Sequence, residues 1–291
     1  MKNLASKALR QIEASVASGI WEAHRGCAAL AGVLLMHGRH VTGECEPIIK
    51  SRVHSLLEDA NQQEELGGRV SFDAFKDHVV HELAVFPQEP RELGHDVIYG
   101  AYVLRALDVF DIEPPQSLLA AVVGLIRKVK DSGPGWISVN GRNEVRPIPK
   151  LFDMDETDCW TRFVQLERPR SMEIGDMQLG HNLTHGHALH VLRSYAHESL
   201  IADMDLAHRR RTRCLRDASC EEGDRAPLRN AAADPRREGY WTLMDSLGDM
   251  HGHVLKYAYS FLDLKRGAVS PEDLQAFGRI VWPQQAATAL E

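Results

Sequence analysis

Histidine-rich segments recur along this chain at places where the sequence has a helical pattern. Fifteen histidines occur in 291 residues, and glycines flank three of the segments. These segments are Gly94-His95, Gly180-His181 with the residues to His187, and His251-Gly252-His253, and a weaker relative surrounds His24. Neutral imidazole is the commonest metal-ligating side chain in proteins. Histidines on successive helices therefore predict a ring of ligands around one central metal ion.

Helical geometry limits how many histidines of the middle segment can reach one ion. His181 and His185 are four residues apart and share a helix face. His185 and His187 point about 200° apart at 100° per residue. We therefore expect His181 to be the ligand of this segment and keep His185 and His187 as reserves.

The last segment carries the most specific pattern, because His253 and Lys256 are three residues apart in an apolar stretch. A lysine inside such a helix must be paired, solvated or neutral. A neutral amine can act as a base, or take up carbon dioxide and become a carbamate, which is an anionic oxygen ligand. The alternative is a lysine whose tip reaches solvent. His251 is the reserve for His253, and Tyr257 stands beside Lys256 as a second candidate catalytic residue.

The elements that must position these residues are almost all helical. Three- and four-residue apolar spacing and helix-start signals predict helices over residues 4–16, 20–36, 45–59, 72–84, 94–109, 116–129, 180–203 (one helix or a pair), 239–264 and from Ser270 onwards. Ser71 and Ser270 are the expected N-caps. Trp136–Val139 is a candidate short strand.

These elements predict one all-α domain over residues 1–289, built as a toroid- or horseshoe-like stack of helix pairs around a central site. Residues 207–238 are charged and poor in large apolar groups, so we expect a mobile loop or lid there. Residues 290–291 resemble a remnant of an expression vector.

Composition excludes several classes of protein. The net charge of −7 argues against a general nucleic-acid or anionic-membrane binder, and no apolar stretch reaches the length of a membrane span. Five widely spaced cysteines without a Cys-x-x-Cys motif indicate a reduced, cytoplasmic protein. The oligomeric state is left open.

The ordered set of histidine segments resembles the questin oxidase-like family, which includes fungal enzymes that oxidatively open anthraquinone rings. His253-Val254-Leu255-Lys256 is similar to the core of the family's Asp-x-His-x-x-Lys motif, although Asp249 lies two residues too early. His181-Asn182-Leu183-Thr184 before Ala188-Leu189 is similar to a family His-x-x-Thr segment. The segments at His24 and from His95 to Leu104 resemble the family's two earlier histidine helices, so the likeness spans residues 20–262.

This resemblance implies a mononuclear non-heme iron centre and an oxidoreductase that uses O2. The implied ligands are four histidines and a carboxylated lysine: His24, His95, His181, His253 and Lys256. An electron-rich aromatic or polyketide-like small molecule, of the kind made in secondary metabolism, is the expected substrate. Candidate residues for its pocket are Trp21, Tyr99, Tyr102 and Tyr259.

Two other functions compete with an Fe(II) oxygenase. The first is an HD-type metal-dependent hydrolase or oxygenase, in which His95-Asp96 binds a divalent metal. Its upstream ligand would be His54, His78 or His81, and its downstream acid Asp249. The second is a helical binding protein without chemistry, whose histidines are structural.

Overall fold

A computed structural model describes most of the chain. The described residues are 1–15, 20–57, 68–89, 91–132, 136–139, 144–147, 159–164, 172–219, 234–246, 252–266 and 269–281. Its first elements are α1 (Lys2–Ala14), α2 (Ile20–His37), α3 (Glu46–Leu56), α4 (Phe72–Leu83), the 3-10 turn η1 (Glu92–Gly94), α5 (His95–Val109) and α6 (Gln116–Asp131). The remaining elements are β1 (Trp136–Val139), β2 (Glu144–Pro147), α7 (Cys159–Val164), α8 (Met172–Leu192), α9 (Glu198–Ser219), α10 (Glu238–Ser246), α11 (His253–Leu264) and α12 (Pro271–Val281).

The all-α class is confirmed, and the only strands in the described residues are two short ones. The candidate strand Trp136–Val139 is confirmed as β1, which pairs with β2 in an antiparallel hairpin. The closure of the helices into a toroid or horseshoe and the single-domain boundaries remain predictions. Residues 290–291 lie outside the described residues.

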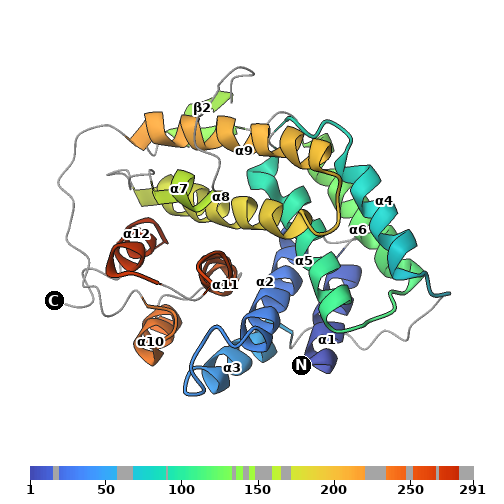
Figure 1. Ribbon diagram of the computed structural model, residues 1–291, viewed down its shortest axis with the longest axis horizontal. Coiled ribbons are helices and arrows are strands. Elements are labelled where there is room, and N and C mark those ends of the chain that lie inside the picture. The colour runs from blue at the N-terminus through green and yellow to red at the C-terminus, as the bar shows by residue number, and fades with distance from the viewer. Residues whose placement is uncertain are drawn as a thin grey trace.

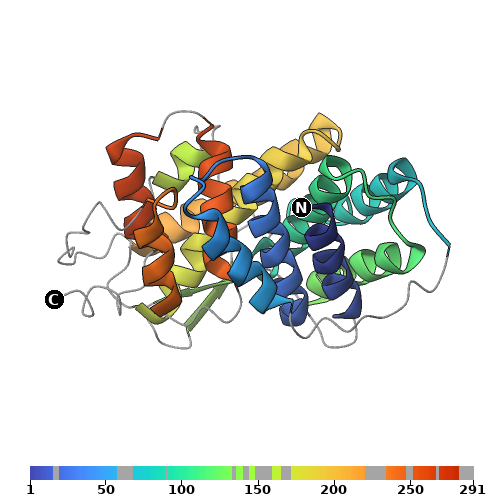
Figure 2. The same cartoon turned by 90° about the horizontal axis from the view of Figure 1, so that it is seen from below.

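Four helices form the centre of the molecule. α2 packs against α5 and α11, and α8 packs against α5 and α11 from the other side. In Figure 1, α8 crosses the middle of the molecule and α11 is seen end-on below it, whereas α4 and α6 lie at one end and α10 and α12 at the other. Figure 2 shows α1 beside α2, so that α2 is covered on its outer side. Helices buried on several faces must be apolar nearly all round, as the α2 and α5 sequences are.

Helix starts follow the predicted caps. Ser71 Oγ accepts a hydrogen bond from the backbone N–H of Ala74 at 3.3 Å. Ser270 Oγ accepts from the N–H of Asp273 at 3.1 Å, and the Asp273 carboxylate accepts from the N–H of Ser270 at 2.9 Å. Both N-caps are confirmed, and the second is a reciprocal capping box.

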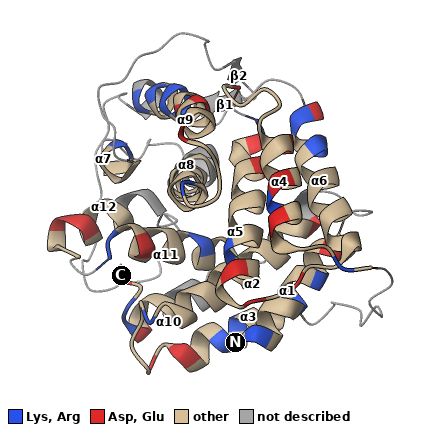
Figure 3. Ribbon diagram, turned by 45° about the vertical axis from the view of Figure 1, so that its right-hand side comes forward, with Lys and Arg blue, Asp and Glu red and all other residues tan. Residues whose placement is uncertain are grey.

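The expected loop over residues 207–238 is wrong in its first part. Residues 207–219 continue α9, and Arg211 is only 1% exposed although its segment looks solvated in the sequence. Figure 3 shows the basic residues of α9 gathered in one half of the helix, and apolar residues before and among them, such as Ala207 and Leu215, are buried. Because arginines surround these apolar residues in the sequence, the buried face of the helix was not recognised there. Residues 220–233 lie outside the described residues.

The predicted helix over 239–264 is two helices, because α10 ends at Ser246 and α11 begins at His253. Gly252 lies between them in the left-handed region with φ of +70° and is the N-cap of α11. This glycine turns the chain just before His253. The long 180–203 segment likewise divides, because α8 ends at Leu192 and α9 begins at Glu198.

Left-handed glycines precede two of the histidines predicted as ligands. Gly94, with φ of +80°, is the N-cap of α5, which begins at His95, as Gly252 is for His253. A Cβ at Gly94 would lie 2.7 Å from the His185 ring, and one at Gly252 would lie 2.6 Å from Ala28 Cβ. Both positions therefore exclude side chains by backbone conformation and by packing.

Replacing Gly252 with alanine should destabilise the fold by about 2–4 kcal/mol, because left-handed strain adds to overlap with Ala28. Urea unfolding of the purified chain measures this change. Gly43→Ala is the matched control, because a Cβ there meets nothing within 4 Å. Its effect should stay within about 0.5 kcal/mol. Equal stabilities of the two variants would contradict the close packing at Gly252.

Candidate metal centre

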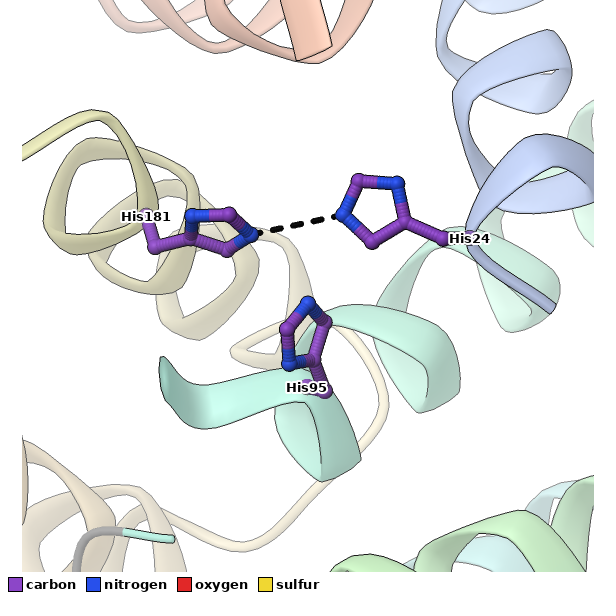
Figure 4. A group of neighbouring side chains, drawn as sticks. All are labelled: His24, His95 and His181. Atoms are coloured by element: carbon purple, nitrogen blue, oxygen red, sulfur yellow. Dashed lines mark hydrogen bonds between the residues drawn. The ribbon is translucent and has the colours of Figure 1, made fainter. Parts of the chain in front are cut away.

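Three predicted histidines from three helices meet in the core. His24 of α2, His95 of α5 and His181 of α8 are fully buried, and each offers a ring nitrogen within 4.8 Å of the others. His24 Nε2 and His181 Nε2 are 3.4 Å apart, and Figure 4 shows the rings converging from three directions. The 3.4 Å separation of His24 and His181 suits two ligands of a single ion at about 2.0–2.1 Å from each, whereas a pair at the full 4.8 Å would have to move closer, because two such bonds span at most about 4.2 Å.

His253 and Lys256 of α11 complete the cluster. The His253 ring centroid lies 4.4 Å from that of His24 and 5.1 Å from that of His181. Lys256 Nζ is 2.5 Å from His24 Nε2, and Lys256 is fully buried. All five residues that the sequence singled out are thus brought together, although His253 is not part of the closest three-histidine group.

A strained turn orients His95. Its Nδ1 lies 2.5 Å from the backbone carbonyl of Glu92 and donates to it, so Nε2 carries the lone pair. Glu92, Leu93 and Gly94 have φ of 27°, 61° and 80°, three left-handed or near left-handed residues in succession. Such a run is costly for the two non-glycine residues and is typical of functional sites. The turn places a carbonyl beneath the imidazole and fixes its tautomer.

Burial and neighbouring positive charge keep these imidazoles neutral. Burial lowers the pKa of His95 well below its ordinary value, and the Lys256 charge lowers it further. The pKa of His181 is lowered for the same two reasons, in the same order. Neutral imidazole is the form that binds a metal ion, so the apolar interior prepares the ligands in their binding form.

The reserve histidines lie elsewhere. The His185 ring is 5.2 Å from that of His208 on α9, and His187 Nε2 donates to the Asp263 carboxylate at 3.0 Å. His187 points away from His181, as six residues at 100° per residue require, whereas His185 shares the helix face of His181 but lies one turn further along α8. Neither reserve belongs to the three-histidine group, and His251 lies outside the described residues.

The predicted pocket aromatics divide into two groups. The Tyr99 ring lies 5.4 Å from His95, and the Tyr257 ring lies 5.8 Å from His253. Tyr102 and Tyr259 instead surround His187, with ring centroids 5.6 and 4.8 Å from it. The side chain of Trp21 is outside the described part of the chain. Among the candidates whose side chains the structure describes, Tyr99 and the candidate catalytic residue Tyr257 border the cluster.

The HD-type arrangement is not assembled by the described residues. Its three candidate upstream ligands are exposed on α3 and α4: His54, His78 and His81. Asp96 is buried, and burial raises the pKa of its carboxyl while Lys130 and Arg91 partly offset that rise. It borders a small cavity with His185 and is not part of the histidine group. Asp249 lies outside the described residues.

Sequence reasoning missed a second buried polar network beside the cluster. It consists of Ser260, Tyr102, His187 and Asp263, joined by hydrogen bonds of 2.9–3.0 Å. Ser260 and Asp263 lie four and seven residues after Lys256, on the same face of α11. The steps of four and seven residues after Lys256 would have been enough to predict from the sequence that Ser260 and Asp263 lie on the same helix face as Lys256.

Comparison of the chain with protein-family models, curated proteins and solved structures finds no match. None of the helices in the described part of the chain has the length and apolar character to cross a membrane.

Acid should destabilise this protein through its buried histidines. Burial lowers the pKa of His185 to about 3, with Arg211 and Arg162 adding to the effect. Stability from this neutral ring is present above the unfolded pKa of about 6.5 and is lost below it, at about 1.4 kcal/mol per pH unit. The free energy of unfolding should therefore depend less on pH in His185→Gln than in the parent chain. Between pH 6 and 4 the difference in slope should correspond to the uptake of one proton, about 1.4 kcal/mol per pH unit.

Urea unfolding at several pH values measures the slope. His54→Gln is the matched control, because His54 is exposed on α3, and this variant should keep the slope of the parent chain. A slope unchanged by His185→Gln would contradict a neutral, buried His185.

Proposed function

We propose that this protein is a metal-dependent oxygenase, with non-heme iron held by His24, His95, His181, His253 and a modified Lys256. The observation that carries the proposal is the buried group of three histidines whose ring nitrogens lie within 4.8 Å of one another. Buried polar groups normally have partners, and three imidazoles that converge without a carboxylate among them suit a cation better than a hydrogen-bond network.

Lys256 determines the charge of the proposed site. A divalent ion cannot share the cluster with an ammonium group whose Nζ is 2.5 Å from His24 Nε2. The lysine must therefore lose its proton when the metal binds. A carbamate on Nζ goes further, because it supplies an anionic oxygen that offsets the ion's charge among neutral imidazoles. The resemblance to questin oxidase-like enzymes supports the same modification.

The choice of iron rests on the ligands and on that resemblance. Imidazole suits iron, zinc, copper and nickel, and an added carboxylate-like oxygen favours iron among ions that use O2. When bound, iron would supply the O2 binding and the electron transfer that the side chains cannot. The chain's own part is to orient His95 through the Glu92 carbonyl, to keep water out of the core and to place Tyr99 and Tyr257 beside the site.

The proposed substrate is an electron-rich aromatic or polyketide-like small molecule. The aromatic rings of Tyr99 and Tyr257 border the cluster, and Tyr257 packs so closely on Gly180 that a Cβ there would lie 2.1 Å from its ring. A flat aromatic substrate would find stacking partners on such a wall. The proposal gives Tyr257 the role of a residue that contacts the substrate.

Metal analysis of protein purified without a histidine tag tests the proposal. We expect about one iron per chain after anaerobic loading, and a drop of at least about tenfold in affinity for His24→Ala, as expected when a central ligand is lost. Intact mass measured with and without bicarbonate should show a gain of one carbon dioxide that Lys256→Met abolishes.

His54→Ala and Asp96→Asn are the controls for the metal analysis, because His54 is exposed and Asp96 lies outside the histidine group. Both should retain iron. If Asp96→Asn loses iron and His54→Ala retains it, the result would favour the HD-type site. If no divalent metal binds to the parent chain, the oxygenase proposal fails, and the histidines are structural.

A further inference from the structure

Four tyrosines form a series from the candidate metal centre to the surface. Tyr99 lies beside His95, and Tyr102 follows one helical turn later on α5. The Tyr102 and Tyr259 rings are 5.5 Å apart. The Arg105 guanidinium is near both Tyr259 and Tyr195, and its charge favours the ionised form of each, which lowers the pKa of both hydroxyls against the effect of burial. The first three tyrosines are at most 2% exposed, whereas Tyr195 is half-buried.

The Tyr102 hydroxyl has a proton acceptor, His187, within hydrogen-bond distance. The hydroxyl oxygen lies 3.0 Å from His187 Nδ1, and His187 Nε2 lies 3.0 Å from Asp263 Oδ2. Because the carboxylate accepts the Nε2 proton, Nδ1 carries the lone pair and accepts from Tyr102. Ser260 Oγ, 2.9 Å away, donates to the same phenol oxygen. Every partner in this network is buried.

Asp263 is arranged to stabilise a charged His187. Burial alone would raise the pKa of Asp263, but hydrogen bonds from His187 and His40 hold it well below its ordinary value. Arg266 Nη2 also reaches Oδ1 at 3.0 Å. The carboxylate is therefore ionised, and an imidazolium formed at His187 would have a buried counter-charge 3.0 Å away.

The outer end of the series has a second acceptor. The Tyr195 hydroxyl donates to Asp108 Oδ2 at 2.8 Å. Burial and this carboxylate raise the pKa of Tyr195 to about 12, which keeps it a neutral phenol. Oxidation of a phenol by one electron makes its proton strongly acidic, so a neutral phenol next to a base is the arrangement that proton-coupled oxidation needs.

We propose that Tyr99, Tyr102, Tyr259 and Tyr195 form an electron-transfer path between the metal centre and the surface. In the main step Tyr102 gives one electron to an oxidised metal centre, and its phenolic proton passes to His187 Nδ1. The centre is reduced by one electron, and a neutral tyrosyl radical remains next to an imidazolium.

The Tyr102 radical is then reduced by an electron that comes from the surface of the protein. Tyr102 takes an electron that reaches it by way of Tyr259 from Tyr195, and its proton returns from His187, while the Tyr195 proton moves to Asp108. A surface reductant of the thiol or ascorbate class supplies the last electron to Tyr195 and releases its own proton to solvent, while the proton held by Asp108 returns to the Tyr195 oxygen. The path would restore a centre that has been oxidised without a substrate in place, and it rests on the proposed oxygenase function for its oxidant.

Photo-oxidation of the metal-free chain tests the path without depending on iron. Laser excitation of ruthenium tris-bipyridine with a sacrificial acceptor generates a one-electron oxidant at the surface. Rapid freezing and electron paramagnetic resonance then report tyrosyl radicals. We expect a long-lived radical on Tyr102 whose yield falls at least about tenfold in Tyr102→Phe. Tyr195→Phe should slow its appearance, and His187→Gln should shorten its lifetime.

Tyr240→Phe is the matched control, because Tyr240 is 1% exposed but packs against Trp241 and Phe277, away from the series. It should keep the parent radical yield. Thermal unfolding of each variant verifies the fold, and the effect of deuterated water on radical decay separates proton transfer to His187 from a packing role. An unchanged radical yield in Tyr102→Phe would overturn the path.

The link to the metal centre is tested by loading the chain with Fe(II) and adding O2 and ascorbate without a substrate. Peptide mass spectrometry should find oxidative damage around His95 and His253 several-fold faster in Tyr102→Phe than in Tyr240→Phe. Equal damage would overturn the link, even if the radical forms. Failure of the chain to bind iron would instead overturn the proposed oxygenase while the photochemical result stands.

Discussion

The structure depends on gathering five nitrogen-bearing side chains in one apolar core, four of them fully buried. His24, His95, His181 and Lys256 are fully buried, and His253 lies against them. Removing such groups from water is costly unless partners satisfy them, and a buried ammonium is the costliest of the five. Neutral imidazoles reduce the cost, because their pKa values are lowered by the same burial. In the proposed function, one cation and an anionic lysine adduct would interact with all five.

Backbone strain shows how the chain positions these groups. Glu92, Leu93 and Gly94 take left-handed or near left-handed conformations just before His95, and Gly252 does so just before His253. A histidine at the first position of a helix follows the path of the preceding turn, so its ring can be aimed by that turn rather than by the helix rotation alone. His24 and His181 lie inside helices and point where periodicity places them. Two histidines fixed inside helices and two positioned by turns can therefore converge from four helices.

The helices and the residues of the cluster were easier to predict from the sequence than the surroundings of the cluster. Helical periodicity found α1 to α6, and serine caps located the starts of α4 and α12, because these signals are local. The five cluster residues could be chosen because each lies in an apolar helical stretch where a polar group is unusual. The partners of His185 and His187 could not, because His208 and Asp263 are distant in sequence and only packing brings them close. Charge misled the interpretation of residues 207–219, where the arginines conceal a buried face.

The helices α5 and α11, which carry part of the cluster, also carry the three inner tyrosines of the series, Tyr99, Tyr102 and Tyr259. On α5, Tyr99 and Tyr102 follow His95 by four and seven residues, and on α11, Ser260 and Asp263 follow Lys256 by the same steps. Residues at these steps share one helix face, so two helices that converge at the cluster must also bring their later turns together. Tyr102 and Ser260 meet at 2.9 Å for this reason. A helix pair built to converge on one buried centre thus extends its polar face towards the surface, and His187 and Asp263 give that face a proton acceptor with a fixed tautomer.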